Sequence, residues 1–166
     1  MGNRFLHRRF CNVEIIDYLC GALSPLSAGL SFYYSDTIIY RDMDEALKKK
    51  LSKDPNGLMT YEYIANNIDS IGDQMPEFVD NMILVDHSGQ FVVSTARYLH
   101  AIDAKKYASS IDKLVKSAIE KDREHVYLAD LIASLWGADY KERAAELSAG
   151  DDNFRRIFKR LYPVGI

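Results

Sequence analysis

Apolar residues recur at helical spacing through the second half of the chain. Residues 104–121 predict an amphipathic helix, residues 122–136 a more apolar core helix, and residues 139–148 a further helix that ends near Gly150. Asp151 and its neighbours can cap a final helix that stops at Pro163. The apolar stripe of this last helix consists of Phe154, Ile157, Phe158 and Leu161.

The first half combines helical and extended patterns. Helices are predicted over about 8–22, from Asp42 or Asp44 to about 52, from an N-cap at Thr60 to about 71, and in a short segment that Pro76 begins. Two segments indicate β-hairpins instead. Residues 30–41 are rich in aromatic and β-branched side chains, and residues 82–94 place two apolar runs around a four-residue loop containing Gly89.

These patterns together predict an α+β fold that is predominantly helical, with the hairpins at about 30–41 and 82–94 followed by a C-terminal run of helices. No internal repeat or long linker divides the chain, so we expect one globular domain over residues 1–166. A chain of 166 residues is long enough to bury a core without a disulfide or a structural metal.

Composition argues against several classes of protein. Cys11 and Cys20 are the only thiols and the four histidines are scattered, so we expect no metal site and no cofactor. Glu14 and Asp17 interrupt the apolar N-terminal stretch, which argues against a signal peptide or a membrane span. We therefore expect a cytoplasmic protein.

The charge is unevenly distributed along the chain. Its formal value is only −3, with 24 acidic and 21 basic residues, yet residues 54–96 hold seven carboxylates and no Lys or Arg. Each flank carries a net charge of +2. The acidic centre could complement the basic flanks within one molecule or across a symmetric dimer, although such unevenness often marks only a polar surface.

The loop Asp86-His87-Ser88 is the first candidate for chemistry, because it gathers a carboxylate, an imidazole and a hydroxyl. Asp, Ser and Gly are also ordinary loop residues, and adjacent side chains seldom form a catalytic relay. His100, which shares a helical face with Asp103, is a second proton-transfer candidate. Asp86, His87 and His100 are the catalytic residues of a hypothetical enzyme with a dispersed site.

The final helix offers a binding candidate of another kind. Four cations alternate there with its apolar stripe, and they could contact phosphates or an anionic surface. The alternative is a helix that packs its stripe on the core and leaves its charges in water. These four residues are Arg155, Arg156, Lys159 and Arg160.

No nucleotide-binding loop, nucleophile elbow or metal-binding motif is present in the sequence. The favoured hypothesis is therefore a small non-catalytic interaction or regulatory protein that binds a protein partner or a second copy of itself. Clustered tyrosines, which suit either a core or an interface, agree with it. The alternatives are an enzyme with a site near residues 86–88, and, less favoured because the net charge is negative, nucleic-acid or anionic-surface binding through the basic C-terminal helix.

Overall fold

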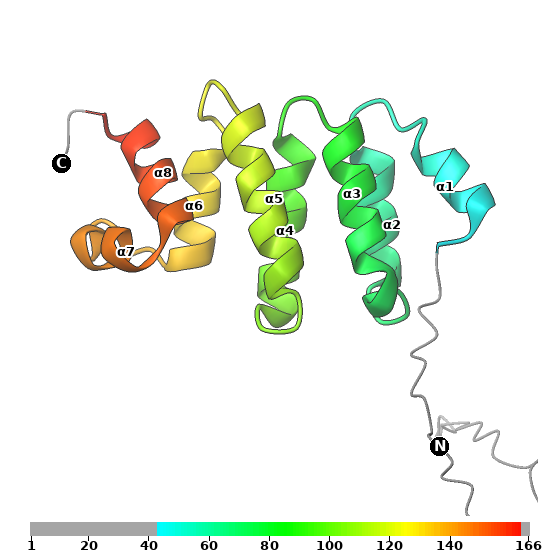
Figure 1. Ribbon diagram of the computed structural model, residues 1–166, viewed down its shortest axis with the longest axis horizontal. Coiled ribbons are helices and arrows are strands. Elements are labelled where there is room, and N and C mark those ends of the chain that lie inside the picture. The colour runs from blue at the N-terminus through cyan, green and yellow to red at the C-terminus, as the bar shows by residue number, and fades with distance from the viewer. Residues whose placement is uncertain (1–42, 164–166) are drawn as a thin grey trace, which may run out of the picture. The chain divides into compact units, whose positions relative to one another are not determined.

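The computed structural model describes residues 43–163, and within this range every regular element is helical (Figure 1). Eight α-helices and one short 3₁₀ turn follow one another without a strand in the described part of the chain. In chain order they are α1 (Glu45–Leu51), α2 (Leu58–Asn67), η1 (Gly72–Gln74), α3 (Met75–Val85), α4 (Gln90–Asp103), α5 (Ala108–Lys121), α6 (Leu128–Trp136), α7 (Ala144–Gly150) and α8 (Asp152–Leu161).

The predicted α+β class is therefore wrong for the described residues, because the hairpin at 82–94 does not form. Its first half is the last turn of α3, where Met82 and Val85 are buried while Leu84 is 67% exposed. Its second half is the first turn of α4, where Val92 and Val93 begin a buried stripe at helical spacing. The hairpin predicted at 30–41 and the helix predicted at 8–22 lie outside the described residues, and the single domain over 1–166 stays a prediction.

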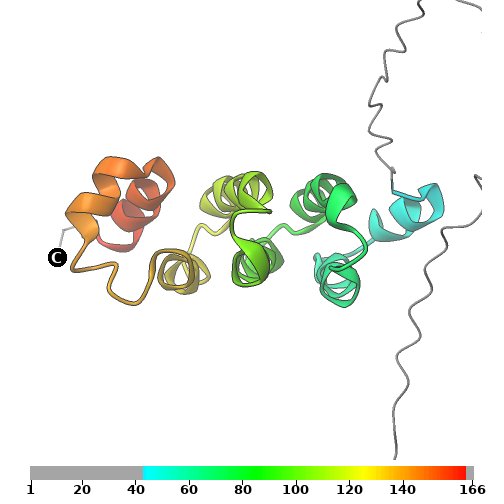
Figure 2. The ribbon, with the colours of Figure 1, turned by 90° about the horizontal axis from the view of Figure 1, so that it is seen from below.

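The helices of the described region form two rows (Figures 1 and 2). One row contains α2, α4 and α6, in which α4 packs against both of the others. The second row contains α3, α5 and α8, and α5 again packs against both neighbours, while α7 packs on α8. Successive helices of the two rows thus pair as α2–α3, α4–α5 and α6–α8, an arrangement of stacked helical hairpins.

An aspartate begins each of these pairs. Asp54, Asp86 and Asp122 are all buried, and each accepts hydrogen bonds from backbone N–H groups up to six residues further along, at the start of α2, α4 and α6. Three residues after each aspartate the backbone is left-handed, at Gly57, Gly89 and His125. The pairs therefore form a structural repeat, with capping aspartates 32 and 36 residues apart by the numbering, although little else in their sequences recurs.

A continuous apolar core joins the rows, and Phe78, Leu99, Leu114 and Leu131 are fully buried within it. Several predicted helix ends are confirmed: Pro76 lies in the first turn of α3, and Asp151 caps α8 by accepting a hydrogen bond from the Phe154 N–H at 3.1 Å. Thr60 is not an N-cap, since α2 begins two residues earlier. None of the described helices combines the length and apolar character that crossing a lipid bilayer requires.

Candidate binding grooves beside helix α5

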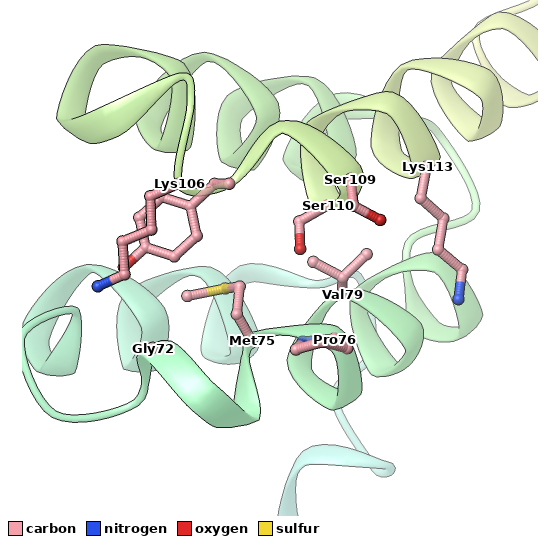
Figure 3. A pocket seen from close by; sticks show the side chains of 9 residues that line it. Gly72, Met75, Pro76, Val79, Lys106, Ser109, Ser110 and Lys113 are labelled. Atoms are coloured by element: carbon pink, nitrogen blue, oxygen red, sulfur yellow. The ribbon is translucent and has the colours of Figure 1, made fainter.

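Two cavities flank the N-terminal half of α5, each at a junction between neighbouring helix pairs. The first, which we name the lysine groove, measures about 250 Å³ and lies between α5 and the start of α3. Met75, Pro76 and Val79 of α3 provide an apolar wall, and Ser110 of α5 faces them across the cavity (Figure 3). Lys106 and Lys113 stand at its two ends.

The polar side chains of the lysine groove differ in the intramolecular contacts that they make. Lys113 forms an ion pair with Asp80 of α3. The Lys106 ammonium lies 5.0 Å from the ring centroid of Tyr107, in a cation–π contact. Ser110 is only 9% exposed as a residue, but its hydroxyl makes no hydrogen bond within residues 43–163 and keeps contact with the solvent in the cavity.

The second cavity, which we name the tryptophan groove, measures about 240 Å³ and lies on the other side of α5, toward α6 and α8. Hydrogen bonds hold its polar side chains in place: the Trp136 Nε1 donates to Asp151 at 3.0 Å, and the Asn153 amide donates to Asp112 at 2.8 Å. Ile111 adds an apolar surface to the same cavity. The result is an apolar floor with two carboxylates at its margin.

Asp112 stays ionised in this environment. A hydrogen bond from the Lys116 ammonium at 2.7 Å is the main reason that the pKa of the Asp112 carboxyl lies below its ordinary value. Partial burial acts in the opposite direction, and the hydrogen bond from Asn153 adds to the lowering. The groove therefore keeps a negative group at neutral pH.

The three residues predicted to be catalytic have different surroundings in the structure. Asp86 is fully buried and accepts from the backbone N–H groups of residues 88, 89, 91 and 92 at 2.8–2.9 Å, so its oxygens cap α4. Ser88 also donates to it at 3.0 Å. The side chain of His87 is exposed and makes no hydrogen bond to any described residue. His100 lies ten residues beyond the start of α4, about 15 Å along the axis, and lines the tryptophan groove.

The four cations of the final helix also have different environments. Arg160 donates to the backbone carbonyl of Ile119 near the C-terminal end of α5, and Arg155 pairs with Asp152 within α8. Lys159 is exposed, and Arg156 is half-buried. The apolar stripe packs inward as predicted, with Phe154 and Ile157 fully buried. Binding of an anionic partner through this helix stays an untested prediction.

No group of three or more His, Cys, Asp or Glu side chains within the described range could hold a metal ion. No family model matches the sequence, and neither the curated proteins nor the solved structures include a significant match.

Sequence reasoning missed both grooves, because their residues come from separate helices. Trp136 is the only tryptophan of the chain, which could have drawn attention to it as a binding residue. Ser110 carries no comparable signal, since a serine in the first turn of a helix is common.

Proposed function

We propose that the protein is a non-catalytic interaction protein that binds a segment of a partner protein in the tryptophan groove. The observation that supports this function is an apolar floor, formed by residues such as Ile111 and Trp136, beside two carboxylates. Such a groove suits one apolar side chain of the partner, with a neighbouring Lys or Arg placed against Asp112 or Asp151.

The size of the cavity favours a side chain over a substrate. About 240 Å³ is below the range of roughly 300–1,000 Å³ that is typical of small-molecule sites. The polar residues are already fixed by intramolecular hydrogen bonds, so a partner would meet a preorganised surface. Stacked helical pairs commonly bind partners along the surfaces that their repetition creates.

Peptide selection tests this function directly. Peptides are selected from a displayed random library on the full chain, and binding is followed by the fluorescence of the single tryptophan, Trp136. We expect peptides that carry an apolar residue next to Lys or Arg and that change the emission, because their anchor displaces water beside the indole. Peptides with no such pattern, or with no effect on the emission, would contradict the proposal.

Two matched substitutions on α4 and in the turn that follows it locate the binding site. Ala104 is exposed and lines the tryptophan groove, whereas Ala101 is exposed but does not line it. We expect Ala104→Arg to weaken peptide binding at least tenfold through bulk and charge, and Ala101→Arg to leave it unchanged. Equal effects of both substitutions would place binding elsewhere.

Self-association is the alternative form of the same function, with a second copy of the chain as the partner. Size-exclusion chromatography with light scattering at low and high salt distinguishes the two forms. A dimer that weakens with salt and is lost in Ala104→Arg would identify the second copy as the occupant. A monomer at both salt concentrations leaves a separate protein as the partner.

The cytoplasm is the proposed compartment. Two cysteines in 166 residues, Cys11 and Cys20, indicate a protein that does not depend on disulfides. Fluorescence microscopy of a tagged full chain checks this, and an exported or membrane-associated signal would contradict it.

A further inference from the structure

The lysine groove contains a hydroxyl donor for which no described residue provides an acceptor. Ser110 is 9% exposed, and its hydroxyl, which has no partner within the described residues, still contacts the solvent in the cavity. Figure 3 shows this hydroxyl directed into the cavity, toward Met75 and Val79. A hydroxyl that meets only the solvent in a cavity is free to donate a hydrogen bond to a ligand with an acceptor oxygen there.

The first turn of α5 adds two more donors. The backbone N–H groups of Ser109 and Ser110 have no acceptor among residues 43–163, and no side chain caps this helix. By contrast, α2, α4 and α6 receive the carboxylates of Asp54, Asp86 and Asp122. Free N–H groups at the N-terminus of a 14-residue helix favour an anion, both as donors and through the helix dipole.

Charge and shape narrow the class of ligand further. Lys106 and Lys113 stand at opposite ends of the cavity and favour an anion with several acceptor oxygens (Figure 3). The wall of Met75, Pro76 and Val79 is apolar and would accommodate an organic group attached to that anion. From these observations we infer that the lysine groove is a binding site for a phosphate monoester with a small apolar substituent.

The carboxylate of Asp80 opposes the binding of a phosphate in the lysine groove. This carboxylate pairs with Lys113, so an incoming phosphate must share or replace that ion pair. Removal of the Asp80 charge should therefore increase affinity, which is the reverse of what most surface substitutions do. The site is separate from the tryptophan groove, so failure of either proposal leaves the other standing.

Phenyl phosphate is the probe, titrated into the ¹⁵N-labelled full chain at constant ionic strength. We expect the amide resonances of Ser109 and Ser110 to shift in a saturable way, with affinity several-fold higher than for inorganic phosphate. Ser110→Ala and Lys106→Gln should each weaken binding about tenfold, because each removes a charge-assisted contact. Asp80→Asn should strengthen binding about threefold.

Lys116→Gln is the matched control. It removes a lysine from the same helix and breaks an ion pair with an aspartate, but that pair lies beside the tryptophan groove. Binding of phenyl phosphate should be unchanged in this variant. Ser110→Ala should also keep the unfolding free energy of the wild type, since the lost hydroxyl has no intramolecular partner, and this separates loss of a ligand contact from loss of the fold.

Three results would overturn the inference. The first is the absence of saturable shifts at Ser109 and Ser110. The second is equal binding of inorganic phosphate and phenyl phosphate, which would remove the role of the apolar wall. The third is an equal loss of affinity in Lys116→Gln and Lys106→Gln. That result would show that phenyl phosphate binds through the overall positive charge and not in the lysine groove.

Discussion

The carboxylate of Asp54 binds Thr60 twice: its Oδ2 lies 2.8 Å from the Thr60 backbone nitrogen and 2.9 Å from the Thr60 hydroxyl oxygen. The same hydroxyl accepts a hydrogen bond from Asn81 of α3, and Asn81 also donates to the carbonyl of Leu51. One buried carboxylate thus supports a network that joins the end of α1 to α2 and α3. The other capping aspartates begin the later helix pairs in a similar way.

Replacement of Asp54 should therefore destabilise the fold. Asp54→Ala leaves the N–H groups of Gly57 and Thr60 without their acceptor, and we expect the unfolding free energy to fall by about 2 kcal/mol. Urea unfolding measures this change. Asp69→Ala, at an exposed position, is the control and should have little effect. Equal stability of the two variants would show that the cap contributes nothing.

Asp54 should also make stability depend on acid pH. Burial alone would raise the pKa of its carboxyl, but the hydrogen bonds from Thr60, Asn56 and Gly57 outweigh it, so the pKa lies below the ordinary value of 3.8. The stabilisation is then present above 3.8 and is lost as the pH falls through the lower, folded-state value. Urea unfolding in this range should show a larger loss for the wild type than for Asp54→Ala; parallel pH profiles would contradict this assignment.

His125 occupies the position that glycine holds in the first two repeats. Its φ is +62°, against +95° at Gly57 and +86° at Gly89. Because a side chain raises the energy of left-handed backbone, His125→Gly should stabilise the protein by up to about 1 kcal/mol. Gly57→Ala should destabilise it, since the new Cβ would lie 2.9 Å from the Met82 sulfur. Thermal unfolding measures the stability of both variants. Destabilisation by His125→Gly would contradict the proposed backbone strain at His125.

Arg160 should contribute to the unfolding free energy, whereas the adjacent Lys159 should not. Its guanidinium donates to the Ile119 carbonyl at the end of α5, where a cation also favours the helix dipole. We expect Arg160→Ala to lower the unfolding free energy by about 1–2 kcal/mol, and Lys159→Ala, at an exposed position, to be neutral. Thermal unfolding of both variants is the measurement. If Arg160→Ala left the unfolding free energy unchanged, the contact with Ile119 would not contribute to stability, and Arg160 would be available to bind a partner.

One tyrosine should titrate at unusually high pH. Burial and the hydrogen bond to Tyr162, with 2.7 Å between the hydroxyl oxygens, raise the pKa of Tyr140 to about 12. Because the folded value lies above the ordinary 10.0, this contribution to stability is complete below pH 10.0 and is lost as the pH rises toward 12. Ultraviolet titration of the phenolates should lose this late step in Tyr140→Phe, and an unchanged titration curve would contradict the assignment.

The sequence predicted the helices best where an apolar stripe coincided with a capping signal. Asp151 before the stripe of Phe154 and Ile157 located α8, and Pro76 located the start of α3, because capping and helical spacing act within a few residues. The hairpin prediction for residues 82–94 was wrong for a related reason. Asp86 and Gly89 suit a hairpin loop and a helix cap equally well, and short β-branched runs agree with either structure.

The surroundings of the candidate site residues could not be predicted from local sequence. The sequence offers Asp86 as a candidate proton-transfer group, and in the structure its oxygens accept hydrogen bonds from the backbone of α4. His100 lines the tryptophan groove together with Trp136 of α6 and Asp151, the N-cap of α8, which lie more than thirty positions away in the chain. Residues so far apart meet only when the helix pairs stack.

The sequence alone determined the predominantly helical character of the described region, the helix ends at Pro76 and Asp151 and the burial of the C-terminal stripe. These features depend on local backbone preferences and on the spacing of apolar residues. Tertiary structure decided that residues 82–85 and 90–94 are helical, because Val92 and Val93 gain a buried environment only when α4 packs between α2 and α6. It also decided that Ser110 faces a cavity and that Trp136 meets Asp151, since those relations arise from the packing of whole helices.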